Sequence, residues 1–265
     1  MENVPIKTWG LEKITLSPTY FNSLRLKYAL EALLPVSGRV LEVGSGAGAF
    51  VRAIKDYRPD LEIVGSEIDI SSVRRARKLD KEGKYDKADV HNLPYKDNSL
   101  DAVLVFDVIE HLESPQKALN EIKRVLKHGG IVHAAIPLEA NLVTVHGLFL
   151  LFGVKPKEIF ADHIKRFNLR DVKEIFNQAG LSSVSFCYSG HYFYQLIDFS
   201  YFSLLSLLGR PLPHTVEGYI ETLPRGYRKS SLSIIRAFLS TLCYLESSIM
   251  GRFPGQIGHF TAKKP

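Results

Sequence analysis

Short apolar runs alternate with helical patterns over the first half of the chain, and this alternation limits the possible folds more than any other feature. The runs that have the length and apolar character of buried strands are residues 39–43, 62–66, 85–88, 101–106 and 131–136. Helical patterns lie between them at residues 50–57, 71–81 and 115–126. Parallel strands need crossover connections of this length. The pattern therefore predicts an α/β fold with a doubly wound, mostly parallel sheet that has helices on both faces.

The rest of the chain extends this pattern and then interrupts it. A helix is expected at each side of the alternating region, at residues 18–34 and 168–179, with Gly180 ending the second. Strands are expected at 181–188 and 256–264. We therefore predict a main domain of residues 1–189 plus 256–265, with an N-terminal helix. Residues 190–255 are predicted to be an inserted, helical and aromatic-rich cap before the last strand.

A glycine-rich loop follows the first apolar run. Gly44, Ser45, Gly46 and Gly48 lie within five residues. Glycine permits positive φ and a close approach of the backbone to a ligand at the carboxyl edge of the sheet. The loop therefore predicts a nucleotide-like ligand. By itself it also fits the dinucleotide pattern G-x-G-x-x-G/A, with a ribose-binding acid about 20 residues further on, so it does not choose between cofactors.

Glu42, two residues before Gly44, separates these interpretations. A carboxylate beneath the loop can meet a cationic ligand group, whereas a pyrophosphate would gain little from it. A buried, hydrogen-bonded carboxylate without a ligand is the alternative. The pattern Glu42-x-Gly44-x-Gly46-x-Gly48 resembles motif I of the class I S-adenosylmethionine-dependent methyltransferases. Residues 93–101, of sequence LPYKDNSLD, resemble the LPFxDxSFD stretch of the small-molecule, methyltransferase type 11-like subgroup.

The resemblance implies that S-adenosylmethionine is the cofactor and that the sheet has seven strands, the last of them antiparallel. The acid at the end of the second strand would hold the ribose hydroxyls, and an acid with an apolar neighbour at the next strand end would bind the adenine. The cofactor-binding residues so implied are Glu42, Gly44, Ser45, Gly46, Gly48, Glu67, Ile68, Asp89, Val90 and Asp107. A strand-end carboxylate can also simply cap a turn. The assignment rests on the joint spacing of the set.

Methyl transfer needs little from the protein, because the sulfonium is already activated and alignment supplies most of the help. A base is required only for a poorly ionised acceptor. The candidate bases are Asp107, His111, His133, His146 and His163. His163 is the first choice, since it precedes a helix on the expected substrate side of the fold.

The cluster Asp107-x-x-Glu110-His111 raises the question of a metal. It resembles the acid-x-x-Glu-His cluster of ubiquinone-pathway O-methyltransferases, in which a divalent ion is implicated. Carboxylates with one imidazole suit magnesium, manganese or zinc. Three side chains on one short turn can diverge too far to share an ion, however. We therefore expect no metal, and we keep these residues as candidates that otherwise cap a helix and line the cofactor pocket.

The predicted cap is rich in aromatic side chains. From Phe186 to Phe202, eight of 17 residues are Phe or Tyr, and apolar residues recur at helical spacing over 231–250. Residues 189–265 carry a net charge of +4 out of the chain's +6. A lipophilic lid with basic edges, able to touch anionic lipid, is one interpretation. A homodimer interface or an enlarged core is the other. The expected partner is a hydrophobic small-molecule acceptor.

Composition narrows the function classes. The chain has 265 residues, 45% of them apolar and 23% charged, as in ordinary globular proteins. The two cysteines have no metal or disulfide spacing, and no signal peptide is recognised, so a cytoplasmic, possibly membrane-peripheral, location is expected. We expect no nucleic-acid partner. An enzyme that methylates a small hydrophobic acceptor is therefore predicted. The alternatives are an NAD-dependent oxidoreductase, a non-catalytic scaffold with this fold and a nucleic-acid methyltransferase.

Overall fold

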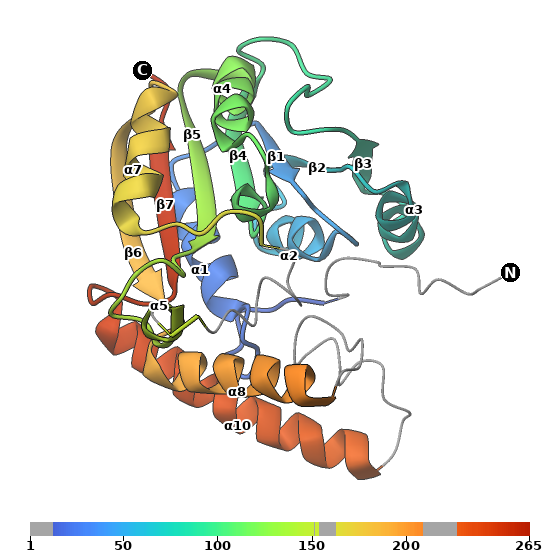
Figure 1. Ribbon diagram of the computed structural model, residues 1–265. Coiled ribbons are helices and arrows are strands. Elements are labelled where there is room, and N and C mark those ends of the chain that lie inside the picture. Colours follow the sequence, from blue (N-terminus) through green and yellow to red (C-terminus); the bar gives the residue numbers. More distant parts are fainter. Residues whose placement is uncertain (1–12, 151, 154–162, 209–226) are drawn as a thin grey trace, which may run out of the picture.

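The computed structural model describes residues 13–150, 152–153, 163–208 and 227–265, and its centre is one sheet in the order β3-β2-β1-β4-β5-β7-β6 (Figure 1). Neighbours among β1 to β5 pair in parallel, whereas β7 is antiparallel to both β5 and β6. The predicted doubly wound, mostly parallel sheet of seven strands with an antiparallel last strand is therefore confirmed. The strands are β1 (Arg39–Val43), β2 (Glu62–Glu67), β3 (Lys84–Lys87), β4 (Leu100–Phe106), β5 (Leu126–Pro137), β6 (Ser182–Ser189) and β7 (Ile257–Lys263).

Helices cover both faces of the sheet. On one face lie α4 (Pro115–Val125) and α7 (Leu169–Gln178), and on the other lie α1 (Ser23–Ala32), α2 (Ala49–Tyr57) and α3 (Ile70–Leu79). Alternate side chains of β4 enter the two layers, with Val103 and Val105 in one core and Ala102 and Leu104 in the other. This alternation follows from the two-residue period of a strand, and it explains why residues 102–106 of β4 are apolar without interruption.

Two boundaries differ by more than two residues from those expected from the sequence. The first helix begins at Ser23 and not at Pro18, because the preceding residues form turns in which the amides of Tyr20 and Ser23 bond to Ser17 and Tyr20. Strand β5 begins at Leu126, before the expected residue 131. The extension is held by the C-terminus, since the amide of Gly129 donates to the carbonyl oxygen of Lys264. A contact between positions so distant along the chain leaves no local trace in the sequence.

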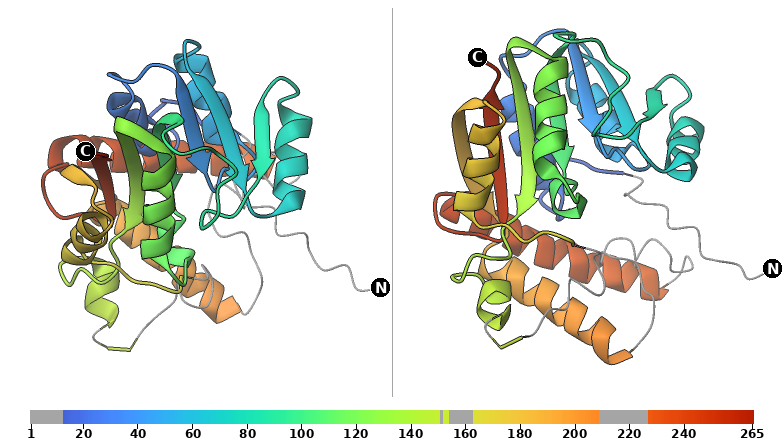
Figure 2. Two further views of the ribbon diagram at one scale, coloured as in Figure 1. Left: turned by 90° about the horizontal axis from the view of Figure 1, so that it is seen from above. Right: turned by 45° about the horizontal axis from the view of Figure 1, so that its top comes forward.

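Two long helices of residues 190–255, α8 (Tyr192–Leu208) and α10 (Tyr227–Met250), lie together at the edge where the parallel strands end (Figures 1 and 2). We call them the cap. A short helix, α5 (Val145–Leu150), packs against α8. Polar side chains of α10 attach the cap to the main domain: the hydroxyl of Ser240 donates to the carbonyl oxygen of Pro18, and the hydroxyl of Ser247 accepts from the amide of Gly190.

Within the described residues, the stretch Ser230–Met250 of α10 is long and apolar enough to cross a membrane, judged by length and composition alone. Only 17% of its most apolar window is buried inside the protein. The core helix of a soluble protein passes the same test but is mostly buried. The feature therefore shows that α10 presents a largely apolar surface outward.

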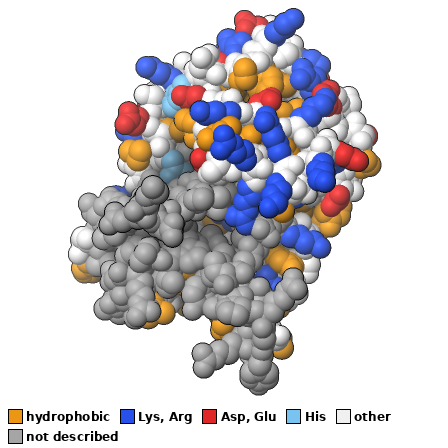
Figure 3. All heavy atoms as spheres, turned by 90° about the vertical axis from the view of Figure 1, so that its right-hand side faces the viewer, with side chains coloured by type: hydrophobic (Ala, Val, Ile, Leu, Met, Phe, Trp, Pro, Cys, Tyr) orange, Lys and Arg blue, Asp and Glu red, His pale blue; other side chains and the backbone are white. Residues whose placement is uncertain are grey.

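Basic side chains also occur outside the cap. Figure 3 shows the side of the molecule at the right of Figure 1, where Lys and Arg side chains gather with acidic and apolar side chains among them. Helix α3 alone contains Arg74, Arg75, Arg77 and Lys78.

The antiparallel end of the sheet offers a stability test at Phe260. This fully buried side chain on β7 lies between Phe176 of α7 and Phe186 of β6, with ring centroids 6.1 Å from each. Because removal of a buried ring leaves a cavity, Phe260→Ala should lower the free energy of unfolding by about 3–5 kcal/mol, measured by chemical denaturation. The exposed Phe253 is the matched control, and Phe253→Ala should leave stability nearly unchanged. Equal losses in the two variants would contradict this account of the core.

Candidate functional site

The glycine loop joins β1 to α2 at the carboxyl edge of the sheet. Gly44, Gly46 and Gly48 all have positive φ, at 71°, 51° and 78°, a conformation that favours glycine. A Cβ at Gly44 would collide with Val108, which follows β4, and one at Gly48 would collide with the ring of Tyr85. The loop is therefore packed closely between neighbouring strand ends, and the sequence prediction of its conformation is confirmed.

Glu67, at the end of β2, supports this loop. One carboxylate oxygen accepts a hydrogen bond from the amide of Gly46 at 3.0 Å, and the other accepts from the amide of Asp69 at 3.0 Å. The amide of Ser45 also donates to the carbonyl oxygen of Ser66 at 2.9 Å. The residues predicted to hold the methionine and ribose parts of the cofactor are thus brought together. A carboxylate fixed by two backbone amides at this edge is well placed to accept further hydrogen bonds from ribose hydroxyls.

Glu42 lies beneath the loop, on β1, and is buried. Its Oε2 has no hydrogen-bond partner among the described residues. Burial, with the nearby charge of Glu67 as a smaller cause, raises the pKa of the Glu42 carboxyl to about 8, although a backbone hydrogen bond from Val51 acts in the opposite direction. A positive ligand group close to Glu42 would favour its ionised form.

Asp89 and Val90, which the family resemblance assigns to the adenine, follow the end of β3, and Ile68, predicted to bind the cofactor, follows β2. Asp89 accepts hydrogen bonds from the amide of His91 at 2.9 Å and lies 2.8 Å from its Nδ1, and these bonds lower the pKa of the Asp89 carboxyl. Val90 is buried, whereas Ile68 leaves 62% of its surface exposed. An exposed isoleucine directly after Glu67 offers an apolar face to a flat ring. The assignment of Ile68 to the cofactor remains a prediction.

The turn after β4 carries Asp107, Glu110 and His111, but it does not direct all three to one point. Asp107 has positive φ, and its Oδ1 accepts a hydrogen bond from Nη2 of the buried Arg25 at 3.0 Å. Glu110 and His111 lie in the short 3-10 helix η1 (Ile109–His111). The divergence anticipated from the sequence therefore occurs at Asp107, whose carboxylate is paired with the N-terminal helix.

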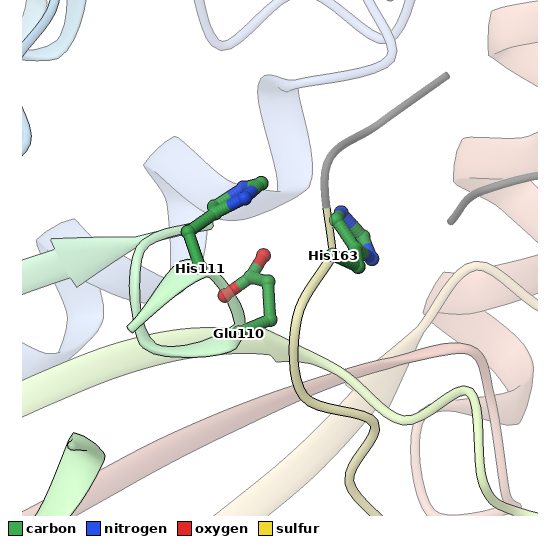
Figure 4. Close-up of side chains that lie close together, drawn as sticks. All are labelled: Glu110, His111 and His163. Atoms are coloured by element: carbon green, nitrogen blue, oxygen red, sulfur yellow. The ribbon is translucent and has the colours of Figure 1, made fainter. Parts of the chain in front are cut away.

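His163, the predicted base, lies beside that turn although it is 52 positions beyond His111 in the chain. The His111 and His163 rings are 4.9 Å apart between centroids and almost perpendicular (Figure 4). Nδ1 of His163 lies 3.0 Å from Oε1 of Glu139, and both side chains are largely buried. The geometry joins the predicted base to part of the predicted metal cluster, which the sequence alone treated as separate features.

Two residues of this region were missed by the sequence analysis. Arg25 lies between Leu24 and Leu26 in α1, where helical periodicity gave no reason to single it out. Glu139 follows the end of β5, and an acid just beyond a parallel strand is a signal that could have been recognised. Among the weaker base candidates, His133 is a structural residue: it is buried within β5, bonded to Thr261, and burial lowers its pKa to about 4. The side chain of His146 lies outside the described part of the chain.

Comparisons with known proteins match this geometry. A family described as "Methyltransferase domain" matches residues 41–134, which include the glycine loop, Glu67, Asp89 and the turn after β4. A demethylmenaquinone methyltransferase of Thermotoga maritima is 34% identical over 105 residues, which make up 39% of this chain and 46% of that protein. The chain spans less than half the length of the first curated relatives that it matches.

Solved structures share the fold over most of the chain. A possible histamine N-methyltransferase of Thermotoga maritima has a TM-score of 0.57 at 19% identity and covers 94% of this chain and 91% of its own. A phosphoethanolamine N-methyltransferase of Haemonchus contortus, in complex with S-adenosyl-L-methionine, has a TM-score of 0.57 at 17% identity and covers 91% and 52%. The chain is similar to class I S-adenosylmethionine-dependent methyltransferases, and its residues 41–134 match their methyltransferase domain. Within that class it is similar to the type 11 family.

The buried Glu42 predicts a pH dependence of cofactor affinity. With a pKa of about 8 in the free protein, Glu42 is largely protonated at pH 7, whereas a bound sulfonium cation would favour the ionised form. Binding should release a proton, so calorimetry should show affinity for S-adenosylmethionine rising from pH 6.5 to 8.5 by up to about tenfold per pH unit. Glu42→Gln should not show this rise in affinity. Because the ligand titrates equally in both experiments, the difference between the two proteins reports Glu42. Parallel profiles would contradict the prediction.

Proposed function

We propose that this protein transfers the methyl group of S-adenosylmethionine to a small, hydrophobic acceptor. The proposal rests on one observation, which is that the cofactor site and the apolar surface of the cap are separate but lie at the same edge of the sheet. The glycine loop and its carboxylates are assembled within residues 42–107, without any help from the cap. The cap lies at the same edge and presents apolar side chains that the cofactor site does not use. Burial of an apolar acceptor beside the cofactor would exclude water from the transferring methyl.

The name of one relative supports the acceptor class. The Thermotoga maritima protein that is 34% identical to part of this chain is named for the methylation of demethylmenaquinone. Its similarity extends over 39% of this chain, so the acceptor is inferred chiefly from the surface of the cap. The same fold can serve other reactions. The proposal is therefore tested by substitution of the site residues.

The test combines cofactor binding with transfer of a labelled methyl group. Glu67→Ala removes an acceptor of two backbone hydrogen bonds and of the expected ribose bonds, so affinity for S-adenosylmethionine should fall about 10- to 100-fold by calorimetry. Glu62→Ala is the matched control, since Glu62 is on the same strand but pairs with Arg39 and Lys84 at the protein surface.

Labelled S-adenosylmethionine is then incubated with the protein and with cell extracts separated into lipid-soluble and water-soluble fractions. Label should appear in the lipid-soluble fraction, and Glu67→Ala should abolish it. Label found only in protein, nucleic acid or water-soluble compounds would refute the acceptor class. NADH fluorescence that changes on mixing, without any binding of S-adenosylmethionine, would favour the oxidoreductase alternative. Cofactor binding without transfer to any fraction would favour the scaffold.

The outward face of the cap suggests where such an acceptor is met. Large apolar side chains of α10 are exposed along one side of the helix; they are Ile234, Ile235, Phe238, Leu245 and Ile249, and we call them the apolar stripe. The two charged side chains of Ser230–Met250 are engaged within the protein, Arg236 over the ring of Tyr20 and Glu246 with the amide of Phe193. The sequence places Arg225, Arg228 and Lys229 before the stripe and the exposed Arg252 after it.

We infer that the apolar stripe rests on an anionic lipid surface, from which a hydrophobic acceptor could enter. An apolar helix face with basic residues near both ends is typical of interfacial helices. The protein should sediment with vesicles that contain phosphatidylglycerol more strongly than with pure phosphatidylcholine. The double variant Ile234→Ser and Phe238→Ser should weaken this binding at least about tenfold.

The control for this experiment is Leu34→Ser, which replaces an exposed leucine at the end of α1. It should leave vesicle binding unchanged. Analytical ultracentrifugation of the same proteins without lipid shows whether the stripe is instead a dimer interface. The contrary outcome is a wild-type dimer, a monomeric double variant and the same vesicle binding by both. In that case the stripe binds a second copy of the chain and not a lipid surface.

A further inference from the structure

Glu110 is a buried acid whose carboxylate makes no hydrogen bond among the described residues. Its side chain is 1% exposed. Burial, with the nearby charges of Asp107 and Glu139, raises its pKa well above the usual range of a glutamate. An unpartnered buried carboxylate is costly, and buried charges in proteins are normally paired or coordinate a metal. A bound cation would give this carboxylate a partner that the described residues do not supply.

Two imidazoles face this carboxylate from different parts of the chain. His111 follows Glu110 in η1, and His163 lies in the segment that precedes α7. Figure 4 shows the Glu110 carboxylate directed toward the space between the two rings. Each of the three side chains offers one ligand atom, and these atoms all lie within 4.8 Å of one another. That spacing is close to what ligands bound about 2 Å from a single ion require.

The backbone holds these side chains together. The amides of Ile164 and Lys165 both donate to the carbonyl oxygen of Glu110, at 3.1 and 2.9 Å. The segment with His163 is thus joined to the turn with Glu110 and His111 through main-chain bonds alone. Oε1 of Glu139 also lies 3.0 Å from Nδ1 of His163, so a second acid stands next to that ring. The arrangement is formed before any ion arrives.

The donor set indicates which kind of ion fits. Asp107 is paired with Arg25 and does not belong to the set. The set consists of the carboxylate of Glu110 and one imidazole nitrogen each of His111 and His163. Magnesium prefers oxygen ligands, whereas zinc, iron and cobalt accept imidazole nitrogen readily. Three protein ligands also leave coordination positions open, as in catalytic metal sites.

We propose that Glu110, His111 and His163 bind one divalent transition-metal ion with at least one coordination position open to the acceptor. The turn that carries them also carries Val108, which packs on Gly44 of the cofactor loop, so the ion would lie on the acceptor side of the cofactor. This site gives His163 the role of a ligand in place of that of a general base.

The role of the ion in catalysis rests on the proposed function, although its binding does not. A hydroxyl acceptor bound to the ion would release its proton to solvent more readily, since a bound cation stabilises the oxyanion. That oxygen would then form a bond to the methyl carbon. The carbon–sulfur bond would break, and its electron pair would stay on the sulfur of the demethylated cofactor.

Metal binding by the full chain is the test. After treatment with a chelator, the protein is titrated with Zn²⁺, Co²⁺ and Mg²⁺ by calorimetry, and the visible absorption of Co²⁺ reports its coordination. We expect one Zn²⁺ or Co²⁺ per chain and much weaker Mg²⁺ binding. Glu110→Gln and His163→Ala should each weaken Zn²⁺ binding at least about 100-fold and change the Co²⁺ spectrum. Circular dichroism checks that each variant folds, and Glu110→Gln is expected to do so because glutamine has nearly the same shape as the buried acid.

Two controls separate this site from its alternatives. Asp107→Asn should still bind Zn²⁺. If Asp107→Asn instead lost Zn²⁺ binding while His163→Ala kept it, the ion would be bound by Asp107, Glu110 and His111. His128→Ala, at an exposed histidine beside the C-terminus, should have no effect. Equal Zn²⁺ binding by wild type, Glu110→Gln and His163→Ala would overturn the proposal. The proposed function would still stand if S-adenosylmethionine bound normally, whereas loss of cofactor binding with Zn²⁺ binding intact would refute only that function.

Discussion

Parallel pairing of β1 with β2 on one side and β4 on the other is the constraint on which the rest of the site depends. Val43 pairs with Ser66 and with Val105, so the three strands end at the same level. The glycine loop, Glu67 and the turn with Asp107 therefore emerge side by side from the three strand ends. Backbone amides and carboxylates at these strand ends are close enough to bond directly, so no long side chain is needed to connect them. A sheet that is buried on both faces is rigid, so it holds the attached cofactor loop in a fixed position.

Most of this arrangement could be predicted from the sequence because its signals are local. Periodicity located the strands and helices, and glycines at 44, 46 and 48 marked a loop whose positive φ the structure confirms. The number of strands and the antiparallel last strand came from the family resemblance, since no local pattern encodes them. Boundaries moved where a distant contact intervened, as where Lys264 extends β5 toward Leu126.

The region around Glu110 was predicted less completely because its contacts join distant segments. The sequence grouped Asp107 with Glu110 and His111 on the basis of proximity in the chain. The structure turns Asp107 to Arg25 of the first helix and brings His163 to the other two. A sequence can suggest that a histidine matters, but it does not show which acid that histidine will face. The exposure of α10 was likewise hidden, because its pattern alone fits a buried helix as well as an outward one.

The two amides that bind the carbonyl oxygen of Glu110 have a consequence for how such a site can change. Because Ile164 and Lys165 hold the turn by main-chain bonds, positions 110, 111 and 163 stay face to face whatever side chains they carry. Substitution there would exchange the chemistry beside the cofactor without rebuilding the fold. A related chain could replace the imidazoles with amides or hydroxyls and keep the same spacing. The backbone therefore acts as a fixed frame in which evolution, or a designer, can install a different acceptor site.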